Sequence, residues 1–235
     1  MKRLFVAAVA VAALAAGAGR AQATSECRGL HVCVRVVGPW VAVPVRTAAP
    51  RPRAEFQLSC PRRYVVGGID ADASIRGIDI TFLGKLGSPV NPGVSTSRAA
   101  VFVATYTGRT AIAPTFRPHI GCIPTSGGGS GPVPYRAVAP AAPPTTTIRR
   151  VTTLRVRPGS TQRAVRRCGA GEQLLTGSSA AGFYTSRPPS PSVVTAVRAR
   201  ANVGADRIVA TVRSTRTLAG VRAIVQVAAV CGGGR

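Results

Sequence analysis

The sequence contains few acidic residues and almost no lysine. Asp and Glu number 7 among 235 residues, whereas Lys and Arg number 31, and 29 of those 31 are Arg. The formal net charge at pH 7 is therefore +24. With seven carboxylates to draw on, three of them in one short stretch, a catalytic pair of the glycosidase kind is not indicated. A charge this basic favours anionic partners.

Aromatic residues are also scarce, at 5% of the chain, and none is interleaved with the arginine runs. Proteins that bind single-stranded nucleic acid stack the bases on aromatic side chains. The sequence therefore argues against nucleic acid as the ligand.

Straight-chain helix formers are nearly absent after residue 23. Leu, Met, Glu, Gln and Lys together number 16 there, against 59 Val, Ile and Thr. Branched residues pack well on a pleated surface and lose rotamer freedom in helices. Apolar residues also alternate, as in 55–60, where Phe56, Leu58 and Cys60 share one face. The chain is therefore predicted to be all-β, with strands near 32–37, 40–45, 54–60, 63–69, 75–83, 98–106, 112–122, 148–156, 162–168, 172–178, 193–203, 206–213 and 221–231.

The first 23 residues have the layout of a secretory signal peptide. A basic start precedes an unbroken apolar run from Leu4 to Ala16, and the segment ends Ala21-Gln22-Ala23, an A-x-A cleavage site. The run of 13 residues is shorter than the roughly 20 that a membrane-spanning helix needs. An uncleaved membrane anchor is the alternative. We expect a secreted protein, extracellular or in the cell envelope, with no transmembrane segment in the mature chain.

A composition break divides the mature chain. Residues 123–147 begin rich in Gly and Ser and end rich in Pro, which is typical of a linker between domains. A long ordered loop within one domain is the alternative. Short strands on each side of the break predict two antiparallel β-sandwich modules. The predicted organisation is a signal peptide over 1–23, module one over 24–122, the linker over 123–147 and module two over 148–235.

The two predicted modules resemble each other in cysteine spacing. The separations are 62 residues for Cys60 and Cys122 and 63 residues for Cys168 and Cys231. Residues 64–68 match 173–177 with a displacement of one residue, which places the extra residue early in module two. We interpret the modules as a diverged tandem repeat.

Six cysteines in an exported chain indicate three disulfides. The repeat, together with the apolar faces on which the cysteines lie, favours Cys60–Cys122 and Cys168–Cys231. The remaining pair is then Cys27–Cys33.

Two metal sites are weaker alternatives. Zinc could bind Cys27, His31 and Cys33, although no fourth ligand is near in sequence. Calcium could bind Asp70, Asp72 and Asp79, although their spacing lacks the pattern of a calcium loop. We expect no metal and no cofactor.

No residue set in the sequence indicates catalysis. The chain has no Gly-x-Ser-x-Gly elbow and no phosphate-binding loop. A Ser–His–Asp arrangement would use His119 with Asp70 or Asp79. The alternation of this strand, in which His119 is opposite in parity to Cys122, predicts a histidine that faces solvent. We expect a non-catalytic protein, with a secreted hydrolase using His119 as one alternative.

The arginines give the leading functional indication. Arg155 and Arg157 share one face of a predicted strand, and Arg198 and Arg200 share one face of another. Guanidinium groups form bidentate contacts with phosphate, sulfate and carboxylate. If the two strands are neighbours, the four side chains form a stripe that attracts an anionic envelope polymer.

Two other readings of the composition stay open. The arginine content can reflect biased base composition, since Ala, Arg, Gly, Pro and Val are abundant throughout. The protein can also be an adhesion module for another extracellular protein, which would expose an apolar patch. The leading interpretation is an extracellular or envelope binding or structural module with an arginine-rich surface.

Cleavage of the signal peptide is predicted after Ala23. N-terminal sequencing of the exported protein should begin at or close to Thr24. A protein that retains Met1 would contradict the prediction.

Overall fold

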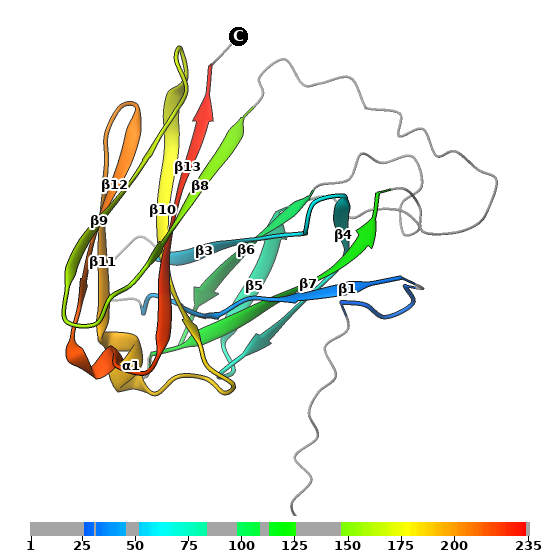
Figure 1. The fold of residues 1–235 in the computed structure, drawn as a ribbon, viewed down its shortest axis with the longest axis horizontal. Helices are drawn as coiled ribbons and strands as arrows, with labels where there is room; N and C mark the ends of the chain where they lie inside the picture. Colours follow the sequence, from blue (N-terminus) through cyan, green and yellow to red (C-terminus); the bar gives the residue numbers. More distant parts are fainter. Residues whose placement is uncertain are drawn as a thin grey trace, which may run out of the picture.

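The structure is a computed structural model, and it describes residues 26–30, 32–45, 52–83, 98–108, 113–125 and 147–233. The predicted signal peptide and most of the predicted linker lie outside these ranges. The described residues form an all-β protein (Figure 1). The N-terminal half contains β1 (Val34–Val37), β2 (Trp40–Ala42), β3 (Arg53–Ser59), β4 (Tyr64–Ala73), β5 (Ile78–Leu83), β6 (Ala99–Tyr106) and β7 (Thr115–Pro124). The C-terminal half contains β8 (Ile148–Arg155), β9 (Thr161–Arg167), β10 (Gln173–Tyr184), α1 (Pro191–Thr195), β11 (Val197–Val203), β12 (Arg207–Ser214), η1 (Arg216–Leu218) and β13 (Arg222–Gly232).

The prediction of an all-β chain is confirmed, and one predicted strand begins too early. The range 193–203 was expected to be strand throughout, but α1 covers its first residues. Proline at the first helical position needs no hydrogen-bond partner for its nitrogen. Two and three residues further on, the N–H groups of Val193 and Val194 both donate to the Ser190 carbonyl. Within the described ranges, no helix is long and apolar enough to cross a membrane.

Each half contributes strands to two antiparallel sheets, and each half has its own core cluster. In the C-terminal half, β13 pairs with β8 and β10, and β12 pairs with β9 and β11. In the N-terminal half, β7 pairs with β1 and β4, and β6 pairs with β3 and β5. The same four pairings therefore occur in the same chain order in both halves.

The register of β4 on β7 matches that of β10 on β13. Val66 lies opposite Cys122 and Leu174 lies opposite Cys231, and a bulge follows each pair. Val66 and Leu174 both lie six residues after the first long-range cysteine of their half. The predicted match between the two short runs that follow those cysteines is therefore wrong by one residue.

The extra residue of the C-terminal half lies between β12 and β13, where η1 forms. Phe102 of β6 and Ala210 of β12 face equivalent positions of β3 and β9. Cys122 follows Phe102 by 20 residues, whereas Cys231 follows Ala210 by 21.

Three disulfides are present, Cys27–Cys33, Cys60–Cys122 and Cys168–Cys231, and their pairing is the expected one. The two long-range disulfides join the end of β3 to β7 and the end of β9 to β13, so each links the two sheets of its half. Because the sulfurs of Cys27 and Cys33 are bonded to each other, the zinc alternative is wrong.

One sheet runs through both halves. Strand β2 pairs with β7 through Val41 and Phe116, and with β10 through Trp40 and Phe183. The resulting order is β1-β7-β2-β10-β13-β8. The two halves are therefore in direct contact through strand pairing, in addition to the chain segment that connects them.

A second contact between the halves closes the free edge of β3. The Gln57 N–H donates to Oε1 of Gln226 at 2.7 Å, and Nε2 of Gln226 donates to the Gln57 carbonyl at 3.0 Å. The carboxamide thus forms both hydrogen bonds that a neighbouring strand would form, on an edge that is otherwise open to association. Ile224, on the same face of β13, joins the core cluster of the N-terminal half.

The lengths of the disulfide loops predict unequal losses of stability. In the chain-entropy model, closing the Cys60–Cys122 loop contributes about 4 kcal/mol and closing the Cys27–Cys33 loop about 2 kcal/mol. We expect Cys60→Ala/Cys122→Ala to lower the free energy of unfolding about twice as much as Cys27→Ala/Cys33→Ala. Urea denaturation without reductant measures both, and equal losses would contradict this ranking.

Candidate anion-binding surface

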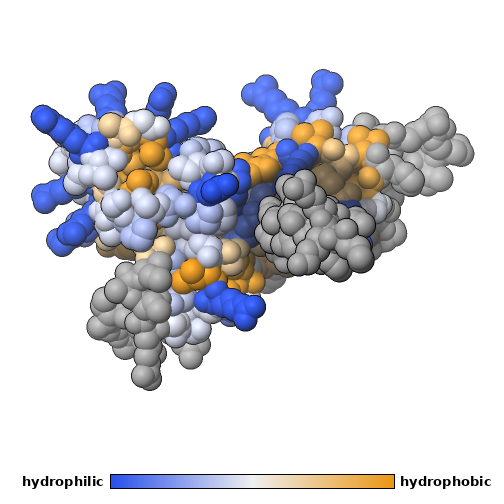
Figure 2. All heavy atoms as spheres, turned by 90° about the horizontal axis from the view of Figure 1, so that it is seen from below, coloured by the Kyte–Doolittle hydropathy of each residue, from blue (hydrophilic) through white to orange (hydrophobic). Residues whose placement is uncertain are grey.

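Six arginines project from one face of the sheet β9–β12–β11. Alternate residues of these strands point into the C-terminal core, and the positions between them point outward. Two outward positions on each strand are arginine. We call these residues the arginine face: Arg163, Arg167, Arg198, Arg200, Arg207 and Arg213. In Figure 2, hydrophilic side chains project from the left-hand end of the molecule, where this sheet lies.

Two pairs of these arginines lie directly opposite each other on neighbouring strands. Arg198 faces Arg213, and Arg207 faces Arg167. Like charges in directly opposed positions destabilise a sheet. In the part of the chain that the structure describes, the face has one ion pair, between Nε of Arg207 and Oδ1 of Asp206 at 3.8 Å. The face therefore presents positive charge that an external anion can neutralise.

The equivalent face of the N-terminal half has a different charge. By strand pairing, β3, β6 and β5 correspond to β9, β12 and β11. Their outward positions hold one arginine, Arg53, and two carboxylates, Glu55 and Asp79. Biased base composition acts on both halves alike. It does not account for six arginines on one face and one on the other.

The structure divides the four arginines that the sequence singled out. Arg198 and Arg200 lie on the arginine face. Arg155 and Arg157 belong to β8 and the turn after it, and β8 is part of the large sheet. Because β8 and β11 are not neighbours, these four arginines do not form one common stripe. Arg155 and Arg157 instead line a hollow of about 740 Å³ together with Arg222.

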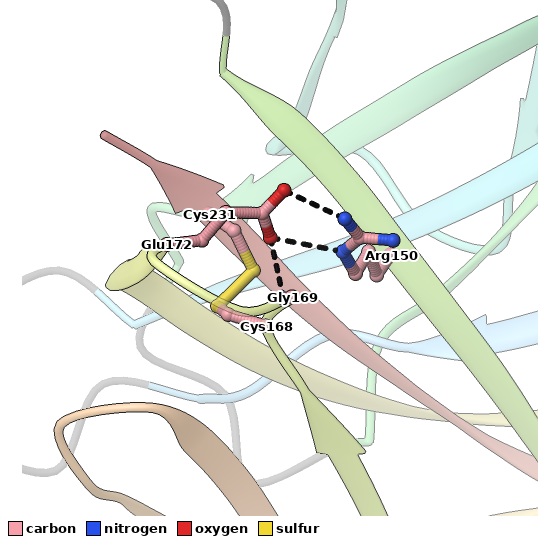
Figure 3. The surroundings of a disulfide bond; sticks show 5 residues. All are labelled: Arg150, Cys168, Gly169, Glu172 and Cys231. Carbon is pink, nitrogen blue, oxygen red and sulfur yellow. Dashed lines mark hydrogen bonds and ion pairs between the residues drawn. A yellow bond between two sulfur atoms is a disulfide. The ribbon is translucent and has the colours of Figure 1, made fainter. Parts of the chain in front are cut away.

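Arg150 is held by a carboxylate next to the C-terminal disulfide (Figure 3). Its Nη2 lies 2.7 Å from Oε1 of Glu172 and its Nε 3.2 Å from Oε2. The Gly169 N–H also donates to Oε2, at 2.6 Å. The hydrogen bond from Arg150, followed by that from Gly169, lowers the pKa of Glu172. The Arg150 guanidinium is therefore already neutralised within the fold.

The same carboxylate belongs to a cluster that could be mistaken for a metal site. Oxygen of Glu172 and the sulfurs of Cys168 and Cys231 lie within 4.8 Å of one another. Both sulfurs are consumed in a disulfide, so neither can act as a thiolate ligand. The three aspartates of the calcium alternative are divided between two sheets, with Asp70 and Asp72 on β4 and Asp79 on β5.

Glu55 is buried where the halves meet, with 6% of its surface exposed. Nη1 of Arg149 donates to Oε2 at 2.7 Å, and the Ser178 hydroxyl donates to the same oxygen at 3.1 Å. Nη2 of Arg53 lies 2.9 Å from Oε1. Burial raises the pKa of Glu55, but Arg149, Arg53 and Ser178 together outweigh it, so the pKa lies below the ordinary value.

An equivalent ion pair occurs in the N-terminal half. Arg35 of β1 lies opposite Gly121, the residue before Cys122. Arg149 of β8 likewise lies opposite the residue before Cys231, so the two arginines occupy equivalent positions. Arg35 pairs with Glu26, whose side chain is 1% exposed. A Cβ on Gly68 or Gly121 would overlap the Glu26 carbonyl. These two glycines therefore let the segment at Glu26 lie directly on the sheet.

His119 is buried, so the prediction that it faces solvent is wrong. Nε2 lies 3.0 Å from Oδ2 of Asp72, and Nδ1 lies 3.4 Å from Nη2 of Arg35. Because a guanidinium group can only donate, Nδ1 accepts and Nε2 carries the proton. Within the described ranges, no serine hydroxyl forms a hydrogen bond with His119. The ring is therefore oriented by Asp72 on one side and by Arg35 on the other.

Exposed apolar side chains are distributed over both halves. The most exposed large ones are Leu83 on β5, Leu175 on β10 and Val203 on β11. Figure 2 likewise shows hydrophobic surface on both sides of the molecule. These side chains do not single out one face for protein adhesion.

Comparison with protein-family models, curated proteins and solved structures finds no match to this chain.

The lowered pKa of Glu55 predicts a loss of stability in acid. The native state keeps this carboxyl ionised to lower pH than the unfolded chain does. Its contribution is therefore full above the ordinary glutamate pKa of about 4.3 and is lost as pH falls through the native pKa. Glu55→Gln should cost about 2 kcal/mol at neutral pH and flatten the pH dependence in acid. Denaturation over a pH series measures this.

Asp79→Asn is the matched control, because Asp79 is an exposed carboxylate of the same sheet. It should leave the wild-type pH dependence in place. If Glu55→Gln also leaves it in place, the ion pair with Arg149 does not stabilise the fold in the way described.

Proposed function

We propose that the protein is a secreted, non-catalytic pair of β-sandwich modules that binds anionic polymers of the extracellular space or cell envelope. The arginine face of the C-terminal module is the binding surface. The observation that carries the proposal is the concentration of six arginines on one sheet face with a single carboxylate partner among the described residues.

The two-module organisation is supported by details that separate folds have no reason to share. Four strand pairings, one bulge and one disulfide recur at equivalent positions in the two halves. A diverged tandem repeat accounts for all of them together. After divergence, the outer face of β3 takes part in the contact between the modules, whereas the outer face of β9, β12 and β11 is free to bind a ligand.

Geometry favours a polymer over a single small ion at the arginine face. Alternate residues of a strand lie about 6.7 Å apart and neighbouring strands about 4.8 Å apart. The six guanidinium groups therefore form a two-dimensional array, which repeated charges can contact at several points at once. A small ion can contact only one or two of them.

Chemistry favours an acidic sugar polymer over nucleic acid. None of the outward positions of β9, β12 and β11 is Phe, Tyr or Trp. Base stacking, which contributes much of the affinity for single strands, has no platform there. Phosphate, sulfate or carboxylate groups on a sugar chain need only the guanidinium donors.

An oxidising location is supported by the cysteines. All those within the described residues form disulfides, which persist outside the cytoplasm. The proposed signal peptide gives the route to that location.

Retention on immobilised heparin tests the arginine face. Arg198→Gln/Arg213→Gln should elute at lower salt than wild type, because two phosphate- or sulfate-binding groups are lost. Its stability should be unchanged or higher by a few tenths of a kcal/mol, roughly, because a directly opposed pair of like charges is removed.

Arg62→Gln/Arg76→Gln is the matched control, since it removes the same charge from exposed positions of the N-terminal half. It should elute close to wild type. Equal shifts for the two variants would mean that net charge alone sets retention, which would overturn the proposed surface.

A further inference from the structure

We propose that the hollow lined by Arg155, Arg157 and Arg222 is a separate site for a phosphate or sulfate monoester carried by a sugar-sized body. The proposal does not rest on the arginine face, because none of the six arginines of that face lines the hollow. Either can therefore fail without the other.

The hollow lies between the turn from β8 to β9 and the start of β13. Its volume of about 740 Å³ is within the usual range of small-molecule sites. It is lined by residues 154–158, Gln162 and residues 220–222. Leu154, Val156 and Val221 are the apolar residues of this lining, and Arg155, Arg157 and Arg222 are its charged residues.

The three arginines have no carboxylate of their own. Within the described part of the chain, no Asp or Glu oxygen lies within 4.0 Å of a guanidinium nitrogen of Arg155, Arg157 or Arg222. All three side chains are exposed. Three like charges around one hollow repel each other, and a bound anion would remove that repulsion.

Arg222 is already held in place. It lies opposite Tyr184 in the register of β10 and β13, and its guanidinium carbon is 4.4 Å from the centre of the Tyr184 ring. Such a cation–π contact restricts the long side chain before any ligand arrives. Less conformational entropy is then lost on binding.

The backbone that carries the other two arginines is also fixed. Oε1 of Gln162 accepts the Arg157 N–H at 2.8 Å, and its Nε2 donates to the Arg155 carbonyl at 3.2 Å. The Ser160 hydroxyl donates to the Arg157 carbonyl at 2.7 Å. The turn that forms one wall of the hollow is therefore held by hydrogen bonds with the side chains of Gln162 and Ser160.

The repeat again provides an internal comparison. The Val156 N–H donates to the Ala223 carbonyl, and at the equivalent place the Val43 N–H donates to the Pro114 carbonyl. The positions that correspond to Arg155, Arg157 and Arg222 are Ala42, Pro44 and Ala113. The triple arginine is thus particular to the C-terminal half.

The number of arginines indicates the shape of the anion. A carboxylate has two oxygens and is fully engaged by one or two guanidinium forks. A phosphate or sulfate monoester has three terminal oxygens directed along three tetrahedral positions, which suits donors from three points of the chain. The apolar part of the lining then contacts the body that bears the ester.

Isothermal titration calorimetry with glucose 6-phosphate tests the site, with glucose and inorganic phosphate as reference ligands. We expect glucose 6-phosphate to bind at least about tenfold more tightly than inorganic phosphate, and glucose not to bind. Arg157→Gln and Arg222→Gln should each weaken binding about tenfold or more. Arg198→Gln, on the arginine face, should leave it unchanged.

Tyr184 variants separate positioning from charge. Tyr184→Leu should weaken binding several-fold with no change in net charge, whereas Tyr184→Phe should bind like wild type. Unchanged thermal unfolding of each variant confirms that the fold is intact. The proposal is overturned if glucose 6-phosphate binds no better than inorganic phosphate, or if Arg157→Gln and Arg198→Gln weaken binding equally.

A second titration distinguishes the source of the ester. A sugar polymer bearing phosphate monoesters, compared with its dephosphorylated form, reports whether the group can be part of a chain. Phosphate-dependent binding that Arg157→Gln abolishes supports a polymer as the source. Binding of glucose 6-phosphate alone supports a free metabolite in the same site. Binding of the polymer that depends only on Arg198 and Arg213 would assign the phosphate to the arginine face and count against the hollow.

Discussion

The buried carboxylate of Glu55 determines how the two halves are joined. A carboxylate removed from water costs several kcal/mol unless cations and hydrogen-bond donors surround it. Here Arg149 and Ser178 of one half and Arg53 of the other supply them. Separating the halves would strip Glu55 of two of these partners and Gln57 of the Gln226 carboxamide. The contact is therefore specific, and it occupies the outer side of β3, so the corresponding side of β9 is the one that remains open to ligands.

The same solution is used twice in the chain. In each half, an arginine at the equivalent position of an edge strand forms an ion pair with a buried glutamate. Arg149 pairs with Glu55 of β3, whereas Arg35 pairs with Glu26, the residue before the first cysteine. The flat surface at Gly68 and Gly121 allows the second arrangement. At the equivalent positions of the C-terminal half stand Thr176 and Val230, whose side chains would obstruct it. The large sheet is thus contacted near β1 and near β8 by different segments, which duplication followed by divergence can produce.

The sequence was informative where structure depends on local pattern. Alternation located the strands, and cysteine spacing with strand parity gave the disulfides. The sequence does not determine the order of the strands in a sheet. For that reason it predicts a stripe of Arg155 and Arg157 with Arg198 and Arg200, whereas the fold places Arg155 and Arg157 with Arg222. Its parity, opposite to that of Cys122, predicts that His119 faces solvent, but the segment at Glu26 lies on that side of the sheet, against Gly121. Glu55 looked like an ordinary outward strand residue for the same reason, since alternation distinguishes two faces without saying which is later covered.

The placement of Glu26 fixes where the chain enters the folded protein. Its carbonyl rests on β4 and β7 of the N-terminal half, and in Figure 1 the sheet formed by β9, β12 and β11 lies at the left-hand end, in the C-terminal half. A group fused ahead of Glu26 is therefore attached to the half that does not carry the six guanidinium groups. The fold itself thus indicates the terminus to choose when the protein is immobilised on a solid support.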